Sequence, residues 1–143
     1  MFAERRVQVL LIIVFILVCL NIFLFRLEVL DSDRGLTFAM LDVGQGDALF
    51  IESPTGTQVL IDSGPSRSVL SELGKVMPPY DRTIDAIIIT NPDADHIAGF
   101  LEILKRYKVR QVFEPGTFNN SKTYENLEAE IQRQNIPRVL VKQ

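Results

Sequence analysis

A run of apolar residues near the N-terminus constrains this chain more than any other feature. Residues 7–25 form a stretch of 19 residues that only Gln8, Cys19 and Asn21 interrupt. As a helix it would be about 28 Å long, close to the roughly 30 Å hydrocarbon thickness of a bilayer. It has no polar face, which a helix buried in a soluble core would show. We therefore expect residues 1–26 to form an N-terminal transmembrane helix that anchors the chain.

A cleaved signal peptide is the main alternative to an anchor. Signal peptides usually have a shorter apolar region and end at a small-x-small cleavage site, and residues 21–30 contain no such site. Basic residues divide evenly between the two flanks, so the positive-inside rule gives only a weak preference. The pair Arg5 and Arg6 beside the N-terminus favours a cytoplasmic N-terminus. This predicts a single-pass membrane protein whose domain lies outside.

The rest of the chain has the composition of one acidic domain. Residues 26–143 carry 13 Lys and Arg against 17 Asp and Glu, so a basic field over the whole surface, as in many nucleic-acid-binding proteins, is absent. Cys19 is the only cysteine, which excludes an intrachain disulfide and a zinc site built from several thiolates. The polar residues 27–35 predict a short linker, and residues 36–143 the domain itself.

Hydrophobic periodicity predicts a mixed α/β sheet for this domain. Three short strands joined by glycine-bearing turns indicate an antiparallel meander, and the later segments alternate between strand and helix. The predicted strands are residues 36–41, 48–51, 58–62, 84–90, 109–113 and 137–141, and the predicted helices are residues 69–76, 96–107 and 123–134. The fold class is therefore α/β.

Residues 90–99, with the sequence TNPDADHIAG, contain the only histidine. They follow the apolar run 86–89 and precede a helical pattern, and α/β proteins place their chemistry at such carboxyl ends of strands. Asp93, Asp95 and His96 are three residues of metal-ligating types within four positions, and carboxylate and imidazole bind Zn²⁺, Mn²⁺ or Fe²⁺. Ligands spaced in this way can serve two neighbouring metals, and the helix N-terminus favours an anion such as phosphate.

Turn and capping chemistry explains each motif when it is taken alone. Asn-Pro-Asp is a common turn initiator, and an Asp before a helix is a common N-cap. Residues 42–47 are, alone, an ordinary loop that its glycines permit. Residues 62–64 make, alone, another turn.

Together and in this order, the motifs DVGQGDA, LIDSG and TNPDADHIAG resemble the metallo-β-lactamase fold. More narrowly, they are similar to the metallo-hydrolase domain of the ComEC-type DNA-internalisation competence proteins, over about residues 36–141. The resemblance implies an αββα sandwich with a metal site built on an H-x-H-x-D-H-like loop and on later His and Asp ligands. It also implies a membrane-anchored hydrolase that uses one or two zinc ions, with manganese or another divalent metal as the alternative, and that acts on phosphodiesters in DNA uptake.

The resemblance assigns roles to individual residues. Asp93 would bind the first metal, and Asp95 and His96 the second. Asp95 would also act in catalysis by orienting the attacking water, and Asn91 would be a weak ligand. Supporting residues beside the site would be Asp42, Gln45, Asp47 and Asp62.

Two departures from the family pattern limit these roles. Asn91 stands where the family's first His is expected, and an amide oxygen is a weak zinc ligand. No histidine follows His96, and residues 114–143 contain no Asp. The chain therefore matches the first half of the sandwich, which would leave the inner face of its sheet exposed.

Two functions of different classes stay open on the sequence. One is a truncated or incomplete membrane-anchored metallo-hydrolase with little activity by itself, whose missing half-domain comes from a continuation of the chain or from a partner chain. The other is a catalytically inactive, membrane-tethered binding module that kept the fold and lost the full metal site.

Overall fold

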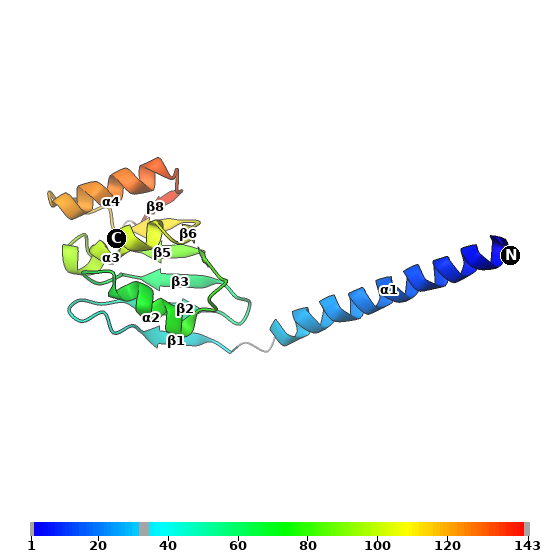
Figure 1. Ribbon diagram of the computed structural model, residues 1–143. Helices are drawn as coiled ribbons and strands as arrows, with labels where there is room; N and C mark the ends of the chain where they lie inside the picture. The colour runs from blue at the N-terminus through cyan, green and yellow to red at the C-terminus, as the bar shows by residue number, and fades with distance from the viewer. Residues whose placement is uncertain (1, 32–34, 142–143) are drawn as a thin grey trace. The chain divides into compact units, whose positions relative to one another are not determined.

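The computed structural model describes residues 2–31 and 35–141. The chain divides into two compact units, with the division between Arg34 and Gly35 (Figure 1). The first unit contains helix α1 (Phe2–Asp31). Within it, Arg5–Arg26 is long and apolar enough to cross a membrane, by length and composition, and all of its 22 residues are exposed.

Helix α1 extends further than the sequence predicted. It ends at Asp31, so residues 27–31 of the predicted linker 27–35 continue the helix, whereas the stretch apolar enough to cross a membrane ends at Arg26. Residues 27–31 contain neither Gly nor Pro, so nothing in them breaks the helix. The other predicted linker residues 32–34 lie outside the described residues.

The second unit is built around a six-stranded mixed sheet with the order β1-β2-β3-β5-β7-β8. The first three strands are antiparallel, and the later ones are added in parallel, as the sequence predicted. The strands of this sheet are β1 (Thr37–Met40), β2 (Leu49–Glu52), β3 (Gln58–Ile61), β5 (Ala86–Ile88), β7 (Val112–Glu114) and β8 (Arg138–Leu140). The helices are α2 (Ser68–Val76), α3 (Ala94–Leu104) and α4 (Lys122–Arg133), and α3 packs against both of the others.

Two of the predicted strands are each broken into two. Residues 84–90 were expected to form one strand, but β4 (Thr83–Ile84) separates from β5 at Asp85. Residues 109–113 divide in the same way into β6 (Lys108–Val109) and β7, and β4 pairs with β6 in a small separate sheet. At the breaks, the Arg110 guanidinium lies 2.8 Å from the Asp85 carboxylate.

The start of α3 also differs from the prediction. The helix begins at Ala94 rather than at His96 and ends at Leu104 rather than at residue 107. Asp95 therefore lies in its first turn with His96, not in the preceding loop. Helix α4 deviates from its predicted range by only one residue at each end.

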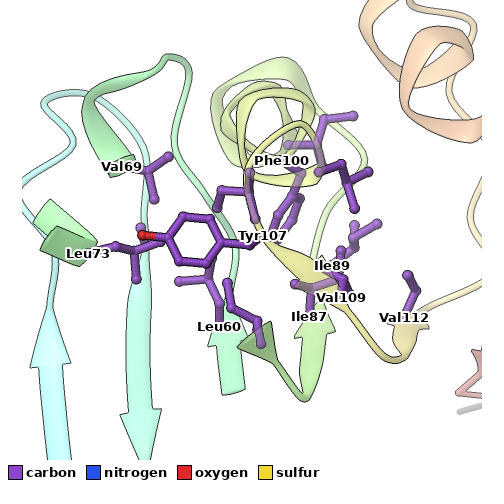
Figure 2. Close-up of a cluster of buried hydrophobic side chains, with 14 of the residues drawn as sticks. Leu60, Val69, Leu73, Ile87, Ile89, Phe100, Tyr107, Val109 and Val112 are labelled. Carbon is purple, nitrogen blue, oxygen red and sulfur yellow. The ribbon is translucent and has the colours of Figure 1, made fainter. Parts of the chain in front are cut away.

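One face of the sheet is buried against the helices. Its central row consists of Phe50, Leu60, Ile87 and Val112, which lie opposite one another across β2, β3, β5 and β7 and are fully buried. Figure 2 shows Leu60, Ile87 and Val112 in one cluster with helix side chains such as Val69 and Phe100. Since each large apolar side chain contributes about 1.5–3 kcal/mol when buried, this face holds α2 and α3 firmly on the sheet.

The opposite face of the sheet is apolar as well, yet it is partly exposed. We call it the open face. Phe38 and Met40 in β1 are 63% and 68% exposed. The strand registers align ten side chains in two rows on this face: Phe38, Ile51, Val59 and Ala86 in one, and Met40, Leu49, Ile61, Ile88, Phe113 and Val139 in the other. Neither row contains a charged or polar residue.

Candidate functional site

Asp62 is the centre of the site. It follows β3 directly, is buried, and has a φ of 53°, in the left-handed region that non-glycine residues seldom adopt. Its carboxylate accepts hydrogen bonds from the Thr90 backbone N–H (2.9 Å) and from the Thr90 hydroxyl. It also lies 2.9 Å from Nδ1 of His96. These three contacts hold the residue in a conformation that costs about 1–3 kcal/mol.

His96 is oriented by this carboxylate. Because an ionised carboxylate only accepts hydrogen bonds, the Nδ1–H of His96 donates and Nε2 carries the free lone pair when the ring is neutral. The hydrogen bond to Asp62 raises the pKa of His96 above 6.5, and the charges of Asp62, Asp95 and Asp47 act in the same direction, while partial burial opposes them. The side chain is 19% exposed. The imidazole is therefore fixed at the surface of the site, with Nε2 available to a ligand or a proton.

The backbone at the start of α3 is held against the end of β3. Ser63 donates both its backbone N–H (2.8 Å) and its hydroxyl (2.9 Å) to the carbonyl oxygen of His96. The same hydroxyl oxygen accepts the Phe100 N–H at 2.9 Å. A Cβ on Gly99 would lie 2.3 Å from the Ser63 carbonyl oxygen. Only glycine permits this approach, which sets the direction in which α3 leaves the sheet.

The DVGQGDA turn approaches the start of α3 and the end of β3. Gly46 has a φ of +86°, and a Cβ there would lie 2.1 Å from the carbonyl oxygen of Asp95. The Gly64 N–H donates to the carbonyl oxygen of Asp47 at 3.0 Å. The side chains of Asp42, Gln45 and Asp47 are exposed, and none has a hydrogen-bond partner among the described residues. Their supporting roles stay predictions, although the charge of Asp47 does act on His96.

Asp93 occupies the N-cap position of α3, but its side chain does not cap the helix. Instead, Oδ2 accepts the Asn91 amide Nδ2 at 2.9 Å, and Oδ1 accepts the Asn119 amide Nδ2 at 2.8 Å. Asn119 was not identified from the sequence, since it lies 26 residues away. The usable signal was topological, because it follows β7, which is parallel and adjacent to β5, and the loops after such strands meet at one sheet edge.

The predicted metal ligands do not form a cluster. Over residues 2–31 and 35–141, no group of three or more His, Cys, Asp or Glu side chains comes together to hold a metal ion. His96 is turned to Asp62, and Asp93 is turned to two amides. The residues present do not by themselves fit a zinc ion. The metal assignments of Asn91, Asp93, Asp95 and His96, and the catalytic role of Asp95, therefore stay predictions.

This arrangement of a mixed sheet, its covering helices and three converging motifs defines the class of protein. The chain belongs to the metallo-beta-lactamase superfamily, whose profile matches residues 41–138. The resemblance inferred from the three motifs is thereby confirmed. Members of the superfamily generally bind divalent metals, usually zinc.

The chain is also similar to individual proteins of known sequence or structure. The chain is 36% identical to ComE operon protein 3 of Bacillus subtilis (strain 168), over 55% of this chain and 12% of that protein. Among solved structures, it is similar to a diphosphatase of the PhnP family, with 21% identity and a TM-score of 0.45 over 68% of this chain and 37% of that one. It is also similar to the Rm3 metallo-beta-lactamase, with 19% identity and a TM-score of 0.44 over 58% and 33%. The chain thus spans only a minor part of each relative.

Proposed function

We propose that this chain is the membrane-anchored first half of a metallo-hydrolase domain, which acts on phosphodiesters once a second β-sheet covers its open face. The open face is the observation that carries this proposal. Its ten aligned apolar side chains extend over all six strands of the sheet. An apolar surface of this extent marks an interaction site in a soluble domain.

A second sheet fits the open face better than a lipid surface does. Sheets pack face to face about 10 Å apart through interdigitated apolar side chains, and the two rows provide such side chains without interruption. A bilayer with anionic headgroups favours basic residues at the rim of a docking face, whereas residues 26–143 carry more acidic than basic side chains. The second sheet would come from a continuation of the chain or from a partner chain.

One feature of the site supports a hydrolase, namely the orientation of His96 by a carboxylate. Asp62 holds one imidazole in a fixed orientation at 2.9 Å, and metal-ligating histidines are commonly oriented in this way by a carboxylate. The later ligands would then be contributed along with the second sheet. The proposed substrate class rests on the resemblance to ComEC-type proteins and on the 36% sequence identity to ComE operon protein 3. The proposed membrane anchorage rests on the length and composition of α1.

The test compares the full chain in detergent with a fusion. In the fusion, the chain continues at its C-terminus into the segment that follows the aligned region of ComE operon protein 3. We expect the chain alone to bind little zinc, to hydrolyse bis(p-nitrophenyl) phosphate poorly and to bind an apolar dye at its open face. The fusion should bind zinc, turn over the substrate and lose the dye. His96→Ala in the fusion should abolish turnover.

Two results would contradict this proposal. Robust turnover by the chain alone would show that no second sheet is needed. A fusion that is folded and loaded with zinc but inactive on phosphodiesters would show that the substrate class is wrong.

The second candidate is a membrane-tethered binding module without catalysis. The contacts of Asp93 favour it, because each carboxylate oxygen already accepts a hydrogen bond from an amide. The same fusion discriminates the two candidates. A binding module would fold and cover its open face, yet it would hold no zinc.

A further inference from the structure

We propose that Asn91 and Asn119 act as an amide clamp on Asp93, which keeps this carboxylate from binding a metal while the clamp is closed. The clamp consists of the two hydrogen bonds from the side-chain amides, at 2.9 Å to Oδ2 and at 2.8 Å to Oδ1. Both oxygens of the carboxylate are therefore engaged. Such bonds to a charged acceptor are stronger than bonds between neutral groups.

The polarity of the clamp is opposite to that of a metal site. Each amide directs its N–H₂ group, the positive end of its dipole, at the carboxylate of Asp93. A cation arriving there would meet the same positive ends, and it would share each oxygen with an existing donor. Asn91 is also turned so that its nitrogen, not its oxygen, faces Asp93. The residue that stands in the place of the family's first His therefore competes with a metal instead of binding it.

Asn119 is held in place by its own partners. Its Oδ1 accepts the Ser121 N–H at 2.8 Å, and Ser121 is the N-cap of α4, where its hydroxyl accepts the Tyr124 N–H. The clamp therefore joins the loop before α3 to the start of α4. Asn119 acts through Asp93, which makes it a positioning residue whose release is the condition for metal binding at this carboxylate.

This inference deepens the proposed function, because a clamp on a predicted metal ligand matters only if that site takes a metal. Its test measures metal binding by the full chain in detergent and does not measure turnover. A wrong clamp and a wrong substrate class would therefore give different results. Co²⁺ is titrated by its visible absorbance, and Zn²⁺ is titrated in competition with it. Thermal unfolding is followed by circular dichroism.

Asn119→Ala should change stability and metal affinity in opposite directions. We expect a lower unfolding temperature and roughly three- to tenfold tighter Co²⁺ and Zn²⁺ binding, tenfold being the change that about 1.4 kcal/mol produces. Asn91→His should tighten binding further, since it removes one amide donor and adds an imidazole. The matched control is Asn120→Ala, because Asn120 is exposed and adjacent; both readouts should stay as in the unaltered chain.

A double substitution isolates the path through Asp93. In an Asp93→Ala background, Asn119→Ala should no longer change the metal affinity. Weaker metal binding by Asn119→Ala would overturn the proposal, because it would mean that Asn119 orients Asp93 as a ligand. Unchanged metal affinity in Asn119→Ala would overturn it as well. So would the absence of detectable Co²⁺ binding by both the Asn91→His and the Asn119→Ala variants at millimolar metal.

Discussion

Asp93 and His96, which lie at the start of α3, are held in different ways. We call their surroundings the Asp93 side and the His96 side. On the His96 side, a buried carboxylate, two bonds from Ser63 and a close glycine contact fix the backbone and the ring. On the Asp93 side, an exposed carboxylate accepts one hydrogen bond from each of two half-buried asparagines. The fold itself therefore places the imidazole. The position of the Asp93 carboxylate depends instead on two side-chain contacts, each of which a single substitution removes.

The largest effect should come from Gly46→Ala. The new Cβ would lie 2.1 Å from the carbonyl oxygen of Asp95, at a φ of +86°. Left-handed strain of about 1–2 kcal/mol and overpacking of about 1–3 kcal/mol should then add to one another. Urea unfolding followed by circular dichroism measures the loss of stability.

Gly44→Ala is the matched control for that substitution. Its φ of +85° is nearly the same, but no atom lies within 4 Å of the new Cβ. It should therefore lose only the strain contribution. Equal losses for the two variants would show that the contact between Gly46 and Asp95 does not hold the His96 side together.

Asp62→Ala should have the next largest effect. It removes the acceptor of three hydrogen bonds at a buried position with a φ of 53°. We expect a loss of about 2–4 kcal/mol, since hydrogen bonds to charged groups contribute about 1.5–3 kcal/mol each and partial rehydration offsets part of that. The companion variant Asp62→Asn keeps the shape and tolerates a positive φ, so its loss should be smaller. If Asp62→Ala lowered the free energy of unfolding no more than alanine substitution of an exposed Asp does, the His96 side would not be the rigid one.

The titration of His96 should report its pairing with Asp62. As the only histidine in the chain, it gives a single pair of imidazole signals in NMR spectra of the metal-free protein. The hydrogen bond to Asp62 raises the pKa of His96 above 6.5, so the midpoint should lie above that value and should fall in Asp62→Asn. The pairing of His96 with Asp62 stabilises the folded protein fully at pH values below the unfolded-state pKa of His96, near 6.5. This stabilisation is lost as the pH rises through the raised folded-state pKa of His96. A midpoint at or below 6.5 would contradict the orientation of the ring.

The order of elements could be predicted from the sequence, because strand and helix periodicities are local. Asp62 was placed among the supporting residues by the resemblance and not by periodicity, since residues 62–64 taken alone predict only a turn. The breaks at Asp85 and Arg110 were missed, and the contact between these two residues, 25 positions apart, leaves no local pattern either. The clamp was missed on the same grounds, because Asn119 follows a different strand from Asp93. Spacing placed the three candidate ligands close together in the chain, but it carried no information about which partner each side chain would choose.

The smallest effects should come from Asp42→Ala and Gln45→Ala. Both side chains are exposed and lack hydrogen-bond partners in the part of the chain that the structure describes. We expect changes within about 0.5 kcal/mol in the free energy of unfolding, as is usual for such surface positions. Unfolding in urea, followed by circular dichroism, checks this. A loss comparable to that of Asp62→Ala would mean that these side chains support the loops of the site, as the sequence predicted. A negligible loss would assign that support to Gly46 of the same turn, which approaches the Asp95 carbonyl oxygen closely.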